Sequence, residues 1–212
     1  MARLKSFITA VAALLAVTAC KGGNRQTMAN QQNDSFVQGG NKTLIVYFSH
    51  RGVNYKQGWT ERGNTEIVAG YIQELIGADT FRIEPVKDYD SMTDYDALVE
   101  LAKQEHDNDE RPAFKGGIQN LEDYDTIILG SPVWWYGYPQ VVFTFLDTYD
   151  LNGKTIIPFS THEGSGLSNF AETLKRYYPE ATIGEGLAIR GRDAEGSKSK
   201  VEKWLKTIGL GK

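Results

Sequence analysis

After residue 42 the chain alternates between short, almost wholly apolar runs and longer segments that carry one apolar stripe. Runs of the first kind are typical of strands covered on both faces of a parallel sheet, and five are present, at residues 43–49, 80–84, 126–130, 155–159 and 186–189. Segments of the second kind are typical of amphipathic helices, and five follow these strands in turn, at residues 64–76, 95–104, 139–146, 170–174 and 201–208. The alternation predicts a doubly wound α/β domain with a five-stranded parallel sheet.

The first nineteen residues follow a different pattern. Arg3 and Lys5 precede an apolar run at residues 7–17, which is the layout of a secretory signal peptide and is too short to span a bilayer permanently. The run leads through small residues into Cys20, the only cysteine of the chain. This ending resembles a bacterial lipobox, in which the cysteine becomes the lipid-bearing N-terminus. A chance cysteine after an ordinary secretory signal is the alternative.

Residues 20–42 are rich in glutamine, asparagine and glycine and contain little to bury, which predicts a flexible tether. The expected organisation is therefore a signal peptide at residues 1–19, a lipidated Cys20 with its tether at 20–42, and one folded domain at 43–212. Two or more acyl chains on one residue anchor a protein firmly. We expect an exported protein that is lipid-anchored to a bacterial membrane on the periplasmic or extracellular side.

Composition and charge exclude several classes of function. The chain is 41% apolar and 24% charged, which suits one globular domain. Residues 1–19 hold two basic residues and no acidic one, so their removal changes the net charge from −4 to −6, a poor match for nucleic acid. A single cysteine excludes disulfides, thiolate zinc sites and cysteine-ligated iron–sulfur clusters, and the histidines lack ligand spacing, so no metal is expected. Redox chemistry would then need an organic cofactor.

In a doubly wound sheet, ligands bind beyond the carboxyl ends of the strands, near the point where strand order reverses. The loop after the first strand runs from Ser49 to a helix that opens at Asn64 and Thr65. Hydroxyls and free N–H groups at a helix start favour an anion, although an ordinary helix cap explains them equally well. This loop is a candidate phosphate site.

The loops after the third and fourth strands point to a flat ligand. Residues 131–139 contain four aromatic residues within five positions, namely Trp134, Trp135, Tyr136 and Tyr138. Stacking on a planar ligand explains adjacent tryptophans in a turn, and a protein contact or a loop folded onto the domain is the alternative. Residues 160–166 add hydroxyls and two glycines, which let a backbone approach a polar-edged heterocycle. A phosphorylated planar molecule such as FMN satisfies all three loops.

Several stretches resemble the flavodoxin-like family. Residues 44–49 and 63–69 resemble its phosphate-loop region, residues 124–135 are similar to its third strand and aromatic loop, and residues 111–114 recur in its larger bacterial members. The resemblance covers residues 43–212 and implies FMN as cofactor and the strand order 2-1-3-4-5. By position it implies phosphate contacts from Ser49, Asn64 and Thr65, ring contacts from Pro132, Val133, Trp134, Trp135 and Gly137, and an opposite wall of Thr161, His162, Gly164 and Gly166.

The chain departs from the family pattern in two places. Ser49 is separated from the helix by an insertion at residues 50–63, so either the insertion bulges outward and its ends converge, which we favour, or Thr60 replaces Ser49. Trp59 on this insertion either covers the ligand site or pins the loop. Trp135 stands where many flavodoxins have a glycine whose peptide flips to contact the one-electron-reduced flavin. A bulky residue resists positive φ, which favours two-electron chemistry.

These observations predict a flavodoxin-like protein that transfers electrons through non-covalently bound FMN. An FMN-dependent NAD(P)H or quinone oxidoreductase is the alternative, and a flavin-free binding protein on the same fold is the second. His162 is the candidate for a proton donor, but no residue is assigned as catalytic, so the choice between carrier and enzyme stays open. The redox partner is accordingly either a protein or a small quinone or nicotinamide substrate.

Overall fold

The structure is a computed structural model that describes residues 42–211. The predictions of a signal peptide, a lipidated Cys20 and a tether concern residues outside this described range. Within residues 42–211, no helix combines the length and the hydrophobicity that a membrane crossing requires.

A parallel sheet forms the centre of the domain. Its strands lie in the order β4 (Asp79–Arg82), β1 (Thr43–Tyr47), β7 (Thr126–Pro132), β8 (Thr155–His162) and β10 (Leu187–Arg190). This is the predicted order 2-1-3-4-5. The sheet has six strands rather than the predicted five, because β9 (Thr182–Ile183) pairs with the start of β8 before β10 pairs with its end. The fifth position is thus shared by two short strands in succession.

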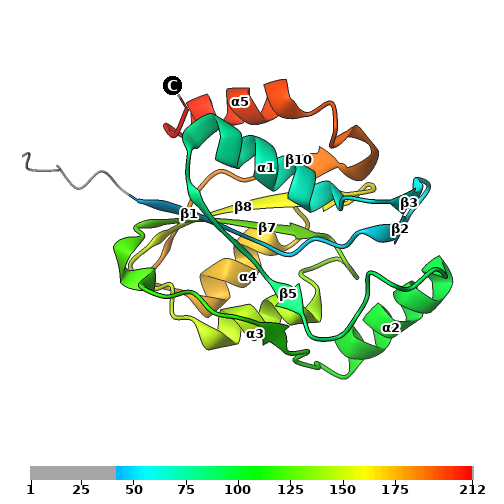
Figure 1. Ribbon diagram of the computed structural model, residues 1–212. Helices are drawn as coiled ribbons and strands as arrows, with labels where there is room; N and C mark the ends of the chain where they lie inside the picture. The colour runs from blue at the N-terminus through cyan, green and yellow to red at the C-terminus, as the bar shows by residue number, and fades with distance from the viewer. Residues whose placement is uncertain (1–41, 212) are drawn as a thin grey trace, which may run out of the picture. The chain divides into compact units, whose positions relative to one another are not determined.

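Five α-helices cover the sheet, as the sequence predicts. Figure 1 shows α1 (Asn64–Ile76) and α5 (Lys198–Thr207) on one face and α2 (Tyr95–Asp107), α3 (Gln140–Thr148) and α4 (Phe170–Tyr177) on the other. Two 3-10 helices, η1 (Leu121–Asp123) and η2 (Gly191–Asp193), lie in connections. The carboxyl ends of the strands point to the side of the molecule where α2 and the β2–β3 labels lie (Figure 1).

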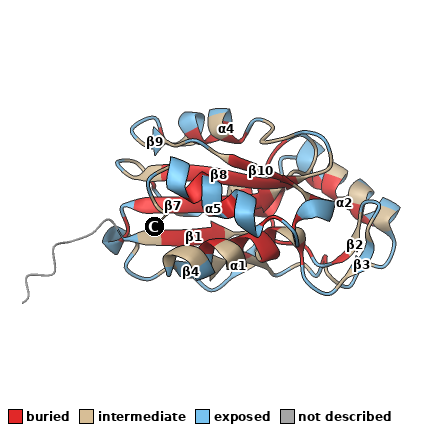
Figure 2. Ribbon diagram, turned by 90° about the horizontal axis from the view of Figure 1, so that it is seen from above, coloured by how far each residue is buried: buried red, intermediate tan, exposed pale blue. Residues whose placement is uncertain are grey.

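Alternation along the strands divides the apolar residues between two cores. In β1, Leu44 and Val46 pack with α3 and α4, whereas Ile45 packs with α1 and α5. Successive side chains of a strand point to opposite faces, so a strand covered on both faces must be apolar at every position. Figure 2 shows the result, with buried residues along the strands and on the inner helix faces.

Two small antiparallel ladders lie outside the main sheet. β2 (Gly52–Asn54) pairs with β3 (Gly58–Thr60) inside the insertion after β1, and β5 (Glu84–Pro85) pairs with β6 (Phe114–Lys115). The predicted strand at residues 80–84 is therefore wrong at its end, since the chain leaves the main sheet after β4. Pro85 has no N–H to donate, which suits a short edge ladder better than a central strand.

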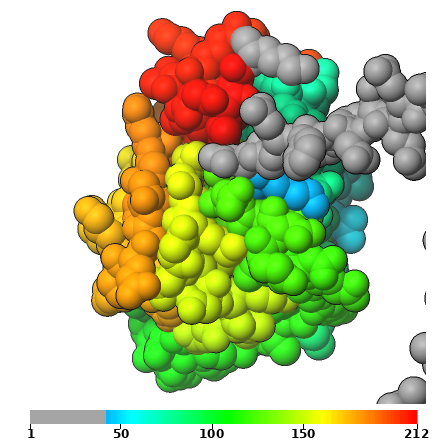
Figure 3. Space-filling view, turned by 90° about the vertical axis from the view of Figure 1, so that its left-hand side faces the viewer, coloured from blue at the N-terminus to red at the C-terminus, as the bar shows by residue number. Residues whose placement is uncertain are grey.

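At the amino ends of the strands, the segments that connect helices to strands cover the sheet. Figure 3 views this end, where α5 in red lies above the yellow and green segments. α5 packs against α1 through one apolar core that includes Val201, Leu205, Val68 and Ile72. The two clefts described below lie at the other end of the sheet.

Gly130 allows β7 and β8 to pack closely. It pairs with Phe159, and a Cβ atom on Gly130 would lie 2.0 Å from a ring carbon of Phe159. We expect Gly130→Ala to lower the free energy of unfolding by about 1–3 kcal/mol, because the buried ring has no room to move. Urea denaturation measures this loss. The loss caused by Gly130→Ala should be smaller in a chain that also carries Phe159→Leu, and an equal loss in the parent and in the Phe159→Leu chain would contradict the clash.

Candidate functional site

Ser49 lies at the start of α1, as the favoured hypothesis for the insertion requires. Its buried Oγ accepts the backbone N–H of Glu66 at 3.0 Å, and Gly63 lies so close that a Cβ atom there would be 2.2 Å from this oxygen. Thr60 instead binds within the β2–β3 hairpin, where its Oγ1 accepts from Asn54 Nδ2 at 2.8 Å. The ends of the insertion therefore converge, and Ser49 rather than Thr60 caps the helix.

The first and third predicted loops meet directly. The hydroxyls of Thr65 and Thr161 lie 2.7 Å apart, and both side chains are buried. Asn64 beside them donates from Nδ2 to Gln57 Oε1 of the hairpin turn at 2.7 Å. The start of α1, the end of β8 and the hairpin are thus joined by side-chain hydrogen bonds.

Two adjacent clefts open at this end of the sheet. The hairpin cleft, about 300 Å³ in volume, lies between the hairpin, the start of α1 and the loops after β7 and β8. The helix cleft, about 520 Å³, lies between α2, residues 133–136 and residues 163–165. The clefts share the lining residues Tyr95, Leu98, Val133, Trp134 and Glu163, so they lie side by side, and the two together are called the groove below.

The structure brings most of the predicted site residues to this groove. Those that line the hairpin cleft are Asn64, Pro132, Val133, Trp134, Thr161 and His162. Those that line the helix cleft are Val133, Trp134, Trp135 and Gly164. Ser49, Thr65, Gly137 and Gly166 line neither cleft. Ser49 and Thr65 support the groove from beneath through the hydrogen bonds above, and the Gly166 carbonyl accepts from Ser160 Oγ at 2.8 Å.

Trp134 forms the aromatic floor of the groove. Its ring meets Phe48 and Tyr89 edge-on, with centroid distances of 5.4 and 5.6 Å, and His50 at 6.0 Å. These contacts fix one side of the indole against the core. The rest of the ring borders both clefts and is available to a ligand.

The turn after Trp134 has a conformation that the sequence did not predict. Trp135 and Tyr136 have φ values of +45° and +61°, and Trp134 and Gly137 exchange two backbone hydrogen bonds of 3.0 Å. This is the pattern of a type I′ hairpin turn, which usually holds Asn-Gly. The bulk of Trp135 was expected to keep it out of positive φ, and that expectation is wrong. Trp135 Nε1 donates to Val99 O at 3.2 Å, which holds the ring on α2.

A charged cluster anchors the base of the hairpin. Asp90 accepts from Arg51 N and Nε at 3.1 and 2.9 Å and lies 3.2 Å from His50 Nδ1 and 3.5 Å from Arg82 Nη2. Burial raises the pKa of the Asp90 carboxyl, but the contacts with His50 and Arg51 and the charge of Arg82 outweigh burial, so the pKa falls below its ordinary value. The carboxylate is thereby stabilised beneath the hairpin cleft.

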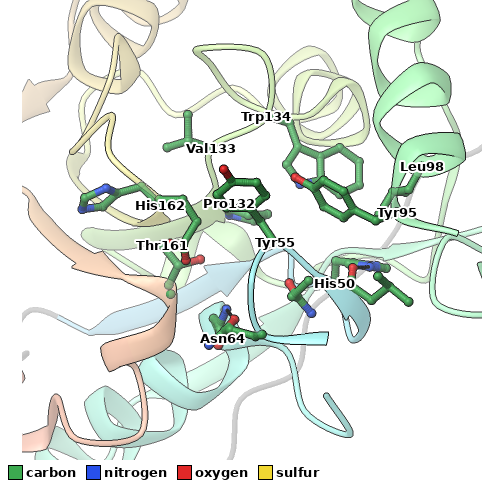
Figure 4. Close-up of a pocket in the computed structure, with 15 residues that line it drawn as sticks. His50, Tyr55, Asn64, Tyr95, Leu98, Pro132, Val133, Trp134, Thr161 and His162 are labelled. Atoms are coloured by element: carbon green, nitrogen blue, oxygen red, sulfur yellow. Dashed lines mark hydrogen bonds between the residues drawn. The ribbon is translucent and has the colours of Figure 1, made fainter. Parts of the chain in front are cut away.

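His162 contributes its backbone rather than its ring to the groove. Figure 4 shows the imidazole turned away from Trp134 and Tyr55. Its Nδ1 accepts from Gly164 N at 3.0 Å, and partial burial together with the charge of Arg190 lowers its pKa. A neutral ring pointing away from the groove does not fit the hypothesis of a proton donor to a ligand there.

Sequence reasoning missed several residues that line the groove, above all Tyr55, Tyr95 and Leu98. Tyr95 opens α2 and lies outside the three loops considered, whereas Tyr55 lies in the insertion of the first loop, where Trp59 was the only aromatic residue singled out. Aromatic residues at the turn of an insertion beside the ligand edge were the signal that could have found Tyr55. Trp59, in contrast, is 52% exposed and lines neither cleft, so it does not cover the site. Among residues 42–211, no cluster of acidic, histidine or cysteine side chains is arranged to hold a metal ion.

Comparisons with known proteins show which proteins this chain and its fold resemble. A family model described as Flavodoxin matches residues 42–208. Flavodoxin 1 of Escherichia coli K12 is 25% identical over 182 residues, which cover 70% of this chain and 88% of the relative. A structure of a candidate flavoprotein from Bacteroides uniformis is 31% identical with a TM-score of 0.64, covering 79% of this chain and 99% of that one.

A further solved structure supports the fold. The flavoprotein from Lactobacillus acidophilus, solved in complex with FMN, has a TM-score of 0.54 and is 20% identical. The match covers 75% of this chain and 98% of that chain.

Loss of the Asp90 charge is expected to weaken the domain in a pH-dependent way. The pKa of Asp90 in the folded domain lies below its value of about 3.9 in the unfolded chain. The contribution of the carboxylate to the free energy of unfolding is therefore complete above about pH 3.9 and is lost as the pH falls through the folded pKa. Asp90→Asn should therefore lower the free energy of unfolding by about 1–2 kcal/mol at pH 7 and by less near pH 3. Urea denaturation at both pH values measures the difference.

Asp88→Asn is the matched control for Asp90→Asn. Asp88 lies in the same segment and accepts from Ser91 N, but it forms no ion pair with any residue of the described range. Its replacement should change the stability little at either pH. An Asp90→Asn deficit that is equally large at pH 7 and pH 3 would contradict the role of the charge.

Proposed function

The chain belongs to the flavodoxin family, and on that premise we propose that it binds FMN without a covalent bond and transfers electrons through it. One observation carries the proposal: Asn64, at the start of α1, and the aromatic floor at Trp134 line the same cleft. A phosphate at one end and a planar ring at the other are the two ends of FMN. The Lactobacillus flavoprotein binds FMN on the same fold.

The donors at the α1 end suit a single phosphate group. The N–H of Glu66 donates to Ser49 Oγ, whereas the N–H groups of Asn64 and Thr65 have no hydrogen-bond partner within residues 42–211. These N–H groups, the Asn64 amide and the positive end of the helix dipole favour an anion without a lysine or arginine. Asn64 and Thr65 would therefore hold the phosphate, and Ser49 would keep the helix start in place.

The opposite end of the groove suits a heterocycle. Trp134 and Val133 offer an aromatic and an aliphatic surface, while Gly164 leaves open space where a side chain would project. The backbone N–H groups of Glu163 and Ser165 have no partner in the described part of the chain, so they can donate to ring carbonyls. When bound, FMN supplies the electron chemistry that the side chains of this chain lack.

The conformation of the turn bears on the kind of redox chemistry. Trp135 already has φ +45°, so its bulk gives no steric reason to expect two-electron chemistry. The turn is therefore compatible with electron transfer in single steps. The direct test is an absorption spectrum of the chain with FMN, followed by stepwise reduction with dithionite and reoxidation in air. A chain that remains colourless and leaves FMN fluorescence unchanged would support a flavin-free binding protein instead.

Trp134→Ala should weaken FMN binding by about tenfold or more, because stacking and apolar contact are lost together. The decrease of FMN fluorescence on titration of the full chain measures the affinity. Trp134→Phe keeps a ring between Phe48 and Tyr89 and should retain part of the affinity, which separates lost stacking from lost folding. Trp59→Ala is the control and should bind as the parent does, since Trp59 lines neither cleft.

We further propose that Cys20 carries lipid and tethers the domain to a membrane, on the strength of the lipobox-like sequence alone. Bacterial cells fed with labelled palmitate should incorporate the label into the parent chain, which should sediment with membranes. Cys20→Ser should lose the label and appear in the soluble fraction after cell disruption. A parent chain that takes up no label would disprove the anchor and leave a plain secretory signal.

A further inference from the structure

Two tyrosines that the proposed FMN contacts do not use face each other at the hairpin cleft. Tyr55 lies at the turn between β2 and β3, and Tyr95 is the first residue of α2. Their ring centroids are 5.8 Å apart and the rings are inclined by 40°. In Figure 4 Tyr55 reaches from the hairpin toward Pro132, and Tyr95 lies beside Trp134. Tyr55 stands on the insertion after β1 and Tyr95 on α2, so together they extend the aromatic surface of the groove beyond Trp134.

The hairpin that carries Tyr55 is fixed at its tip and at its base. Gln57 at the tip accepts from Asn64 of α1 at 2.7 Å. Arg51 at the base donates twice to Asp90. The hairpin backbone that carries Tyr55 therefore loses little conformational freedom when a ligand binds, which lowers the cost of binding at this position.

The α2 end that carries Tyr95 is fixed as well. Asp94 caps the helix and accepts the N–H groups of Asp96 and Ala97 at 2.9 and 3.3 Å. The ring of Tyr95 is half-buried and lines both clefts. The two rings thus stand on separate, anchored elements with ligand-accessible space beside them.

The charge of the lining restricts the ligand. The acidic lining residue is Glu163, and no lysine or arginine is among the described residues that line either cleft. Lys56 lies 4.9 Å over the Tyr55 ring but lines neither cleft. The free N–H groups at α1 can meet one phosphate, whereas a dinucleotide would bring further phosphate charges without a cation to pair them. The aromatic walls suit a flat molecule, and Glu163 with no lysine or arginine beside it disfavours an anionic one.

We propose that Tyr55 and Tyr95 form a binding site for an uncharged planar aromatic compound, beside Trp134 in the same groove. The site rests on the proposed FMN function, since it places a small aromatic molecule next to the cofactor as the partner for electron exchange. It deepens that function by choosing a small aromatic compound over a nicotinamide dinucleotide. Both rings belong to the protein, so the site itself does not require FMN to be formed.

The test uses the full chain in detergent, with and without FMN, and two probes of the same shape. 1,4-Naphthoquinone is uncharged, and its 2-sulfonate carries a negative charge. Calorimetric titration should show at least tenfold tighter binding of the uncharged probe. Tyr55→Ala and Tyr95→Ala should each weaken that binding by roughly three- to tenfold, whereas Tyr→Phe at either position should keep the affinity. Trp59→Ala is the matched control on the same hairpin and should leave it unchanged.

The failures of the two proposals are distinguishable. A chain that does not bind FMN refutes the proposed function, and titration of that FMN-free chain with naphthoquinone still decides whether the tyrosines form a site. Equal affinity for both probes, or an unchanged naphthoquinone affinity in Tyr55→Ala and Tyr95→Ala, overturns the tyrosine site. A Tyr55→Ala variant in which the affinity for FMN falls by the same factor as the affinity for naphthoquinone also overturns the tyrosine site, because the rings would then belong to the cofactor site.

Discussion

The hydrogen bond between the hydroxyls of Thr65 and Thr161 holds the functional end of this molecule together. It joins the first turn of α1 to the end of β8 over a length of 2.7 Å, and both side chains are buried. Without its partner, each hydroxyl would be a buried polar group with an unmet hydrogen bond, at a cost of about 1–3 kcal/mol. Ser49 adds a second tie to Glu66 N. Because these bonds fix the helix start against the sheet, the donors proposed for phosphate and the loop after β8 keep one relative position.

In the aromatic loop at residues 134–137, hydrogen bonds offset the strain of the backbone. Left-handed backbone at Trp135 and Tyr136 costs on the order of 1–2 kcal/mol per residue. The backbone pair between Trp134 and Gly137 and the indole bond to Val99 offset that cost. The strain therefore persists beside the groove, where it turns Trp135 onto α2 and leaves Trp134 as the floor. Strained backbone that surrounding contacts maintain is a common feature of ligand sites.

Hydrophobic patterning was sufficient to predict the sheet and its helices, because a strand between two helix layers must be apolar at every position, as residues 44–46 are. The strand order came from the resemblance to flavodoxins. Trp134 and Thr161 were predictable because their loops directly follow strands. Tyr55 was not, since the course of the insertion depends on polar contacts such as that between Asn64 and Gln57. Such contacts between irregular segments leave no periodic signal in a sequence.

The insertion adds an aromatic wall to the groove, because the hairpin and α2 place Tyr55 and Tyr95 beside it. The hairpin depends on Asp90, whose charge is held beneath it by Arg51 and Arg82. The same ion cluster therefore joins the hairpin to the sheet, because Arg82 belongs to β4 and Arg51 to the hairpin base. Protonation of Asp90 would weaken this connection, so the position of the aromatic wall depends on the charge of one carboxylate.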